Sequence, residues 1–195
     1  MNFLAHAVLS YGNGDVLTGN MIADEIKGKA ALEAYPDGIR KGIILHRAID
    51  TFTDSHPAVM RAKVWFREAY HLYAGPVLDT IFDHFVANDP KIFQSEAALL
   101  AFTQKTYAQV DANSEYFPPH FTRFFPYMKS ENWLYNCRTV MGAKRSLQGL
   151  YRRAPKMAPP EVAYEIFIVN YYALGQCYYE LMDALVAFVK SRPAD

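Results

Sequence analysis

Apolar residues recur at intervals of three and four along almost the whole chain, which is the pattern of amphipathic helices. Clusters of Gly, Pro, Asn and Asp separate these periodic segments and mark turns. The strict alternation of apolar and polar residues that indicates strands is absent. The pattern therefore predicts an all-α fold, with helices over residues 2–10, 16–28, 38–53, 57–72, 76–88, 95–111, 120–128, 131–152 and 161–190.

The helical pattern continues without a Gly- or Ser-rich linker, an internal repeat or a low-complexity tract. A chain of 195 residues is long enough to bury one hydrophobic core and has the usual length of one domain. We therefore predict a single-domain helical bundle over residues 1–195.

Composition and charge exclude several classes of protein. The chain is 51% hydrophobic, and its 20 Lys and Arg balance its 20 Asp and Glu, which argues against a general nucleic-acid binder. The two cysteines, Cys137 and Cys177, are too few for a disulfide scaffold. The most apolar stretch, residues 166–185, is interrupted by polar and charged residues and does not read as a membrane span. We expect a cytoplasmic protein with neither nucleic acid nor membrane as its partner.

The polar chemistry lies mainly in the first half of the chain. Five of the six histidines and eight of the eleven aspartates precede residue 90, whereas the second half is aromatic and basic. This distribution predicts a chemical site in the first half and a wall or docking surface in the second half.

His46 and Asp50 are the first candidate site residues. They are four residues apart, so they share one face of the predicted helix over 38–53 with Ile39 and Ile43, opposite a larger apolar arc. If that face were exposed to solvent, the two isoleucine side chains would be exposed as well. We therefore expect this face to form the wall of a cleft.

Three further polar residues lie on largely apolar helices. Asp83 and His84 are adjacent on the helix predicted over 76–88, and Asp24 lies on the helix predicted over 16–28. A buried carboxylate needs a cation or hydrogen-bond donors, and a mixed carboxylate and imidazole set suits Mn²⁺ or Mg²⁺. These residues are thus candidate metal ligands, although helix caps and hydrogen-bonded core residues remain the alternative interpretation.

Several segments together resemble one family. Residues 1–6, 19–24, 42–57, 73–85 and 132–134 are similar to the acyl-carrier-protein phosphodiesterases, and the most specific string is LHRAIDTFTDSHP at 45–57. The resemblance implies an all-helical fold distantly related to the HD-domain phosphohydrolases. It also implies metal-dependent hydrolysis of the phosphodiester between 4′-phosphopantetheine and a serine of holo-acyl carrier protein. The family's motif residues map to Asp24, His46, Arg47, Asp50, Asp83 and His84.

Two places depart from the family's pattern. His71 and Leu72 stand before Tyr73 where relatives carry a basic pair, and residues 88–90 lack an expected aromatic side chain. The first departure removes support for phosphate binding by this stretch.

The resemblance leads to a hypothesis about individual roles. We expect Mn²⁺ or Mg²⁺ to be held by Asp24, His46, Asp50, Asp83 and His84, or a subset of them, and Arg47 to bind a phosphate oxygen. His6 is either a further ligand or the acid that protonates the leaving serine oxygen. The alternatives are an HD-like nucleotide phosphohydrolase that uses the same ligands, and a non-catalytic helical binding module.

A basic segment supplies a candidate docking surface for the carrier protein. Residues 132–160 contain no Asp or Glu, but they contain six Lys and Arg. An acyl carrier protein is acidic, so a basic strip would steer and orient it, although a solvated helix face has the same composition. The expected docking residues are Arg138, Lys144, Arg145, Arg152 and Arg153.

Overall fold

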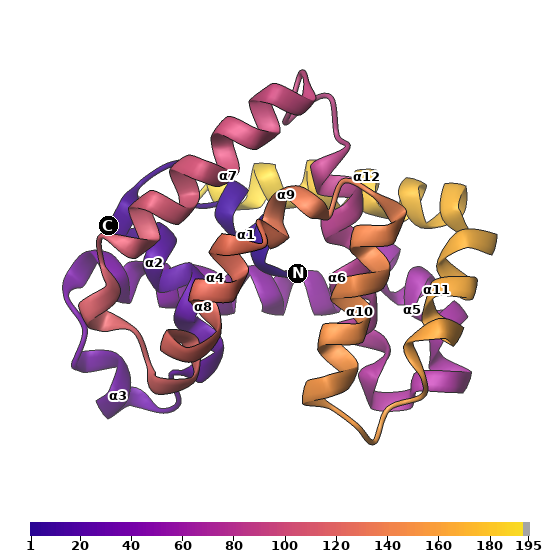
Figure 1. The fold of residues 1–195 in the computed structure, drawn as a ribbon, viewed down its shortest axis with the longest axis horizontal. Coiled ribbons are helices and arrows are strands. Elements are labelled where there is room, and N and C mark those ends of the chain that lie inside the picture. Colours follow the sequence, from indigo (N-terminus) through magenta and orange to yellow (C-terminus); the bar gives the residue numbers. More distant parts are fainter. Residues whose placement is uncertain (193–195) are drawn as a thin grey trace.

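Helices joined by short loops make up the computed structural model, which describes residues 1–192 (Figure 1). The α-helices are α1 (Phe3–Val8), α2 (Gly14–Ile22), α3 (Lys29–Glu33), α4 (Asp37–Ser55), α5 (Pro57–Tyr70), α6 (Ala74–Ala87), α7 (Glu96–Asp111), α8 (Pro119–Ser130), α9 (Trp133–Asn136), α10 (Val140–Arg153), α11 (Pro160–Val169) and α12 (Tyr171–Lys190). Short 3₁₀ helices are η1 (Ala23–Glu25), η2 (His71–Tyr73) and η3 (Ser114–Tyr116).

The predicted all-α class is confirmed, since no strand occurs in the described part of the chain. The relationship to HD-domain proteins stays a prediction, and the last three residues of the predicted domain lie outside the described residues. None of the described helices combines the length and the apolar character that crossing a membrane requires.

One predicted helix, over 131–152, is divided into α9 and α10. The Thr139 hydroxyl accepts a hydrogen bond from the Gly142 backbone N–H at 2.9 Å, which caps α10 at its first turn. Side-chain caps of this kind compete with helix continuation, which the apolar periodicity alone does not reveal.

The long helix predicted over 161–190 is also two helices, α11 and α12, which meet at Asn170. The Asn170 side-chain amide donates to the Ile166 carbonyl oxygen at 2.9 Å. The side chain thus provides a hydrogen-bond donor for a carbonyl oxygen in the last turn of α11. The remaining predicted helices are present with ends shifted by a few residues, and α3 is an addition to them.

Close packing of α2 against α4 positions the candidate site. A Cβ atom added at Gly19 would lie 1.9 Å from the Ile39 carbonyl oxygen, and one at Gly42 would lie 2.1 Å from that of Val16. Only glycine permits this approach of the two backbones. The predicted helix over 16–28 ends as α2 at Ile22, so η1 follows directly and lies against α4.

The buried side of α4 is the one that carries His46. Ile39, Ile43 and His46 are at most 6% exposed, whereas Ile44 of the expected core arc is 42% exposed. The opposite apolar arc also contributes to the core, because Ile49 is 0% exposed and Leu45 and Phe52 pack against the core. The His46 side is buried because α2 packs on the glycine-containing face, where its backbone can approach most closely.

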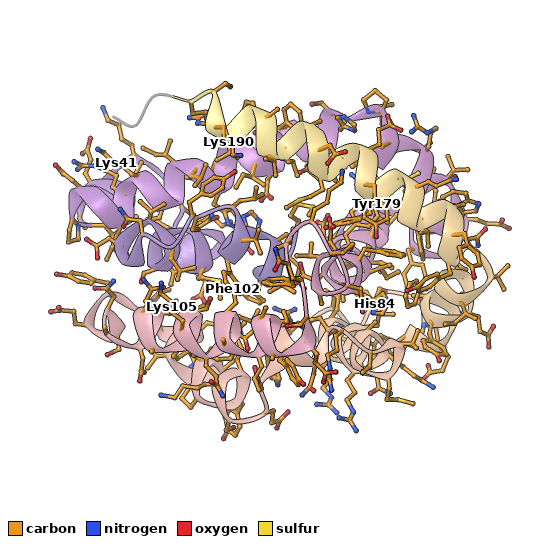
Figure 2. All side chains as sticks on the ribbon, turned by 90° about the horizontal axis from the view of Figure 1, so that it is seen from above. Lys41, His84, Phe102, Lys105, Tyr179 and Lys190 are labelled. Carbon is orange, nitrogen blue, oxygen red and sulfur yellow. The ribbon has the colours of Figure 1, made fainter. Side chains whose placement is uncertain are left out.

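The neighbouring helices complete the layer around α2 and α4. Figure 2 shows α7, with Phe102 and Lys105, on one side of this pair and α12, with Tyr179 and Lys190, on the other. In the second half of the chain α10 packs against α6 and α11, while α12 packs along α5. This arrangement leaves α8 and α10 on either side of the N-terminal residues (Figure 1).

Candidate metal centre and the adjoining cavities

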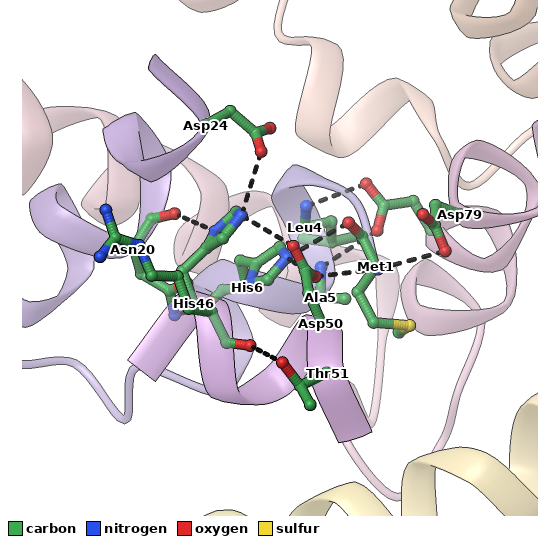
Figure 3. Close-up of polar contacts among 12 residues, drawn as sticks. Met1, Leu4, Ala5, His6, Asn20, Asp24, His46, Asp50, Thr51 and Asp79 are labelled. Carbon is green, nitrogen blue, oxygen red and sulfur yellow. Dashed lines mark hydrogen bonds and ion pairs between the residues drawn. The ribbon is translucent and has the colours of Figure 1, made fainter. Parts of the chain in front are cut away.

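Two histidines and an aspartate from α1 and α4 form a compact group. Among residues 1–192, His6, His46 and Asp50 are the one set of three His, Cys, Asp or Glu residues whose ligand atoms all lie within 4.8 Å of one another. His6 Nε2 is 3.3 Å from Asp50 Oδ1, and His46 Nε2 is 3.0 Å from Asp50 Oδ2. The two imidazole rings stack with their centroids 4.0 Å apart (Figure 3).

The hydrogen bonds of His46 require positive charge at its Nε2 atom. Nδ1 lies 2.8 Å from the Asn20 carbonyl oxygen, so Nδ1 must carry a proton and donate it. Nε2 then faces two carboxylates, Asp50 at 3.0 Å and Asp24 at 3.3 Å. A neutral ring would turn its lone pair toward these oxygens, so a proton or a metal ion has to lie there.

The pKa of His46 agrees with this geometry. Burial lowers it, but the hydrogen bonds to Asp24 and Asp50 outweigh burial and raise the pKa of His46 to about 9. Burial also favours the neutral form of Asp50, yet the hydrogen bonds from His46 and His6 hold the pKa of Asp50 well below its usual range. Asp50 is thus an anion at neutral pH and is available to a cation.

His6 is buried beneath this pair and is neutral. Its ring is 2% exposed, and burial lowers the pKa of His6 to about 4. Its Nδ1 is a buried atom without a hydrogen-bond partner among the described residues. A neutral imidazole is the form that ligates metals, but Nε2 also lies 3.2 Å from the Met1 carbonyl oxygen, so its proton would have to leave before that atom bound an ion.

This donor set fits a divalent metal ion. Two imidazole nitrogens and one carboxylate converge, and the backbone carbonyl at His46 Nδ1 holds that ring in the tautomer that leaves Nε2 for a metal. Asp24 approaches the same nitrogen from η1 with a side chain that is 78% exposed, so it lies at the rim. Of the five ligands predicted, the structure brings together His46, Asp50 and Asp24, and it places beside them His6, which was expected to be either a further ligand or an acid.

His84 does not belong to this group, contrary to expectation. Its Nδ1 lies 2.9 Å from the Cys137 carbonyl oxygen, and its Nε2 lies 2.8 Å from the Tyr171 hydroxyl. The ring packs edge-on against Phe85 and Phe167. Both nitrogens have protein partners in the core, so His84 is not placed to share a metal with His46.

Asp83 holds the first helix instead of facing His46. Its two carboxylate oxygens accept hydrogen bonds from the backbone N–H groups of Leu4 and Ala5 at 2.9 and 3.1 Å. These are free donors at the N-terminus of α1, where a carboxylate is favourable. Burial raises the pKa of Asp83 to about 7, although these hydrogen bonds oppose the rise. Asp83 therefore positions α1, which carries His6.

Two contributors to the site were missed by the sequence analysis. Asp79 lies 3.1 Å from the α-amino group of Met1, which is itself 3.5 Å from Asp50 (Figure 3). Its spacing of four residues from Asp83 is the signal that could have found it. Asn20 contributes its backbone carbonyl oxygen. Every residue has such an oxygen, so the residue type at this position could not have predicted the contact.

A cavity of about 400 Å³ opens beside the group and includes Asp24, His46, Asp50 and Arg47 in its lining. The Arg47 guanidinium donates to the Ile26 carbonyl oxygen at 2.8 Å, which anchors it at the mouth. Arg47 therefore lines the same cavity as Asp24, His46 and Asp50, and its contact with phosphate stays a prediction.

A larger cavity, of about 780 Å³, is lined by some of the expected docking residues but not by all of them. Arg145, Arg152 and Arg153 line it. Arg138 stacks on Tyr135 and is bound to Glu96 at 2.9 Å, while Lys144 lies over a tyrosine ring of α11. Arg138 and Lys144 therefore face away from this cavity, and only part of the basic segment forms one surface.

The larger cavity lies close to η1, the element that carries Asp24. Burial lowers the pKa of the Arg153 guanidinium, and the charge of Asp24 opposes this effect. His120, also in the lining, lies 3.2 Å from Glu25, the residue after Asp24. Arg153 and His120 thus connect the larger cavity with η1, which carries the exposed carboxylate of Asp24.

Comparison with known proteins identifies the family. Residues 1–185 match the family described as acyl carrier protein phosphodiesterase. The chain is 31% identical over 192 residues to the protein of that name from Enterobacter sp. (strain 638), covering 98% of this chain and 99% of the relative. It is 32% identical over 187 residues to those from Salmonella agona (strain SL483) and Salmonella newport (strain SL254), covering 96% of each chain. No solved structure matches. The resemblance carried by the sequence motifs is confirmed, and the chain belongs to the acyl carrier protein phosphodiesterase family.

Proposed function

We propose that this protein is a metal-dependent phosphodiesterase that hydrolyses the bond between 4′-phosphopantetheine and the serine of holo-acyl carrier protein. The products are apo carrier protein and 4′-phosphopantetheine. The observation that carries the proposal is that His46 Nε2 requires a cation, because it lies between two carboxylates, in the lining of a cavity that also includes Arg47. Membership of the family supplies the substrate class.

His6, His46 and Asp50 would hold the metal ion, with Asp24 as a further ligand at the rim. Two imidazoles favour Mn²⁺ over Mg²⁺, which prefers oxygen ligands. The chemistry that such an ion supplies is activation of water and stabilisation of charge on the phosphoryl group.

The remaining residues orient the substrate. Arg47 lines the cavity beside the group, Arg153 lines the larger cavity, and both present guanidinium donors that match phosphate oxygens. His6 lies beneath His46 and is 2% exposed, so the serine oxygen of a protein substrate does not reach it. This burial supports the ligand role for His6 over the role of general acid.

Mass spectrometry of holo carrier protein incubated with the enzyme and Mn²⁺ tests the proposal. We expect loss of the phosphopantetheine mass, and we expect EDTA to abolish that loss because the ligands then hold no ion. If the enzyme hydrolyses nucleotides but leaves holo carrier protein unchanged, the result would favour the nucleotide phosphohydrolase. If the protein contains no metal, and EDTA changes neither its activity nor its stability, the non-catalytic binding module is the hypothesis that remains.

Charge reversal at the cavity tests how the carrier protein docks. We expect the double variant Arg152→Glu, Arg153→Glu to raise KM for holo carrier protein about 10-fold, because steering acts mainly on association, and to lower kcat as well, because Arg153 is also proposed to contact the phosphate. The advantage of the wild type should shrink as salt rises, since charges are screened beyond roughly 8 Å at physiological ionic strength.

The matched control is the double variant Arg138→Glu, Lys144→Glu, which changes the charge equally but lies outside the cavity. Steady-state kinetics at two salt concentrations should give this control a KM close to that of the wild type. An equal rise in KM for both double variants would show that the positive charge of the whole segment attracts the carrier protein, without a specific docking surface at the cavity.

The acidic partner and the cytoplasmic location remain part of this proposal. The two buried, unpaired cysteines are consistent with a reducing compartment.

A further inference from the structure

The larger cavity has two unlike walls. On one side Phe124 of α8 stacks in parallel with Trp133, with ring centroids 6.2 Å apart. On the other side the lining residues Arg145, Ser146, Gly149 and Arg152 lie along one face of α10. The volume of about 780 Å³ is in the range of sites that enclose a small molecule.

The two ends of the cavity differ in their chemistry. Arg152 and Arg153 lie in the last turn of α10, and the charge of Asp24 acts on Arg153. The opposite end is lined by Leu134 and Cys137, which are 1% and 6% exposed. From Gly142 to Arg153 the helix advances roughly 16 Å, so the cavity is elongated along α10.

We propose that this cavity holds the pantetheine arm of the substrate, with the phosphate at Arg152 and Arg153 and the thiol end at Leu134 and Cys137. The choice of ligand rests on the function proposed above. The arm carries an anionic phosphate, a branched apolar segment and two amides, in that order. Arginines, the Phe124 ring and the polar groups of Ser146 and Gln148 provide partners of matching chemistry.

Gly149 leaves the middle of the α10 wall open. A Cβ atom added there would meet no atom within 4 Å, whereas one at Gly142 would lie 1.7 Å from the Asn136 carbonyl oxygen. Gly142 is therefore required by packing, but Gly149 is not. Glycine is a poor helix former, so its presence inside α10 has to be explained by something other than helix stability. An unobstructed path for the arm explains it, which makes Gly149 a specificity-determining position.

The variant Gly149→Phe tests the assignment by filling the cavity from a position that has room for a side chain. We expect kcat/KM for holo carrier protein to fall on the order of 100-fold. Saturation-transfer NMR with free pantetheine should show contacts to the arm's methyl groups in the wild type and none in the variant. Circular dichroism and Mn²⁺ binding check that the variant is folded, and Gly149→Leu provides a smaller obstruction with an intermediate loss.

Met141→Phe is the matched control, because Met141 lies on the same helix, is 53% exposed and is not part of the cavity lining. We expect it to match the wild type in both measurements. Pantetheine contacts or turnover that persist at the wild-type level in Gly149→Phe would overturn the assignment. A wild type that binds pantetheine in a Gly149-dependent way but leaves holo carrier protein intact would support the cavity assignment and refute the proposed reaction.

Discussion

Asp50→Asn should abolish Mn²⁺ binding and lower phosphodiesterase turnover about 1,000-fold, because a metal ion contributes several kcal/mol to charge stabilisation in the transition state. Both oxygens of Asp50 face the histidines, with Oδ1 at 3.3 Å from His6 and Oδ2 at 3.0 Å from His46. The substitution preserves the shape of the side chain and removes its charge. The two imidazoles then lack the anion that completes a cation site.

The matched control is Asp54→Asn, one helical turn further along α4. Asp54 is exposed and pairs with Lys63 at 2.7 Å, outside the metal group. It should retain both Mn²⁺ affinity and turnover, measured by titration calorimetry and by release of 4′-phosphopantetheine. Equal losses in the two variants, or wild-type metal binding in Asp50→Asn, would contradict the assignment of the centre.

His84→Leu should unfold more easily by about 3 kcal/mol, which corresponds to a Tm lower by roughly 10 °C for a domain of this size. Leucine cannot form the two hydrogen bonds of the His84 ring. The Cys137 carbonyl oxygen and the Tyr171 hydroxyl therefore each lose a hydrogen bond. The affinity of the folded protein for Mn²⁺ should not change. Thermal unfolding with and without Mn²⁺ measures both quantities.

The comparison variant is His46→Leu, because His46 is also a buried histidine but lies in the metal group. It should lose Mn²⁺ binding, and Mn²⁺ should no longer raise its Tm. A His84→Leu protein that keeps its Tm but loses Mn²⁺ binding would restore His84 as a ligand. A double variant with Tyr171→Phe should cost less than the sum of the two single changes, because both remove the same hydrogen bond.

The ends of several helices follow from local chemistry that the sequence displays. Pro57 opens α5 and Pro160 opens α11, where the missing N–H of proline has no helical partner to lose. The divisions at Thr139 and Asn170 were not predicted. Each depends on whether one polar side chain turns back to bond its own backbone, and apolar periodicity is unaffected by that choice.

The helical class and the family resemblance can be recognised from the order of residues alone. The pairing of His46 with Asp50 can be predicted in the same way, because residues four apart on one helix must share a face. Helix geometry also predicts that Asp83 and His84, as neighbours on a helix, point in directions about 100° apart. The packing of α6 against its neighbours is what directs Asp83 toward α1 and His84 toward the aromatic core.

Which donors share one cation was likewise decided by tertiary packing. The glycines at the contact of α2 with α4 let the backbones approach, which brings the Asn20 carbonyl and the Asp24 carboxylate to His46. The hydrogen bonds from Leu4 and Ala5 to Asp83 hold α1 where His6 stacks on His46. A metal centre is defined by distances of a few ångströms between helices. Those distances are set by how the helices pack against each other, whereas periodicity along the chain describes each helix alone.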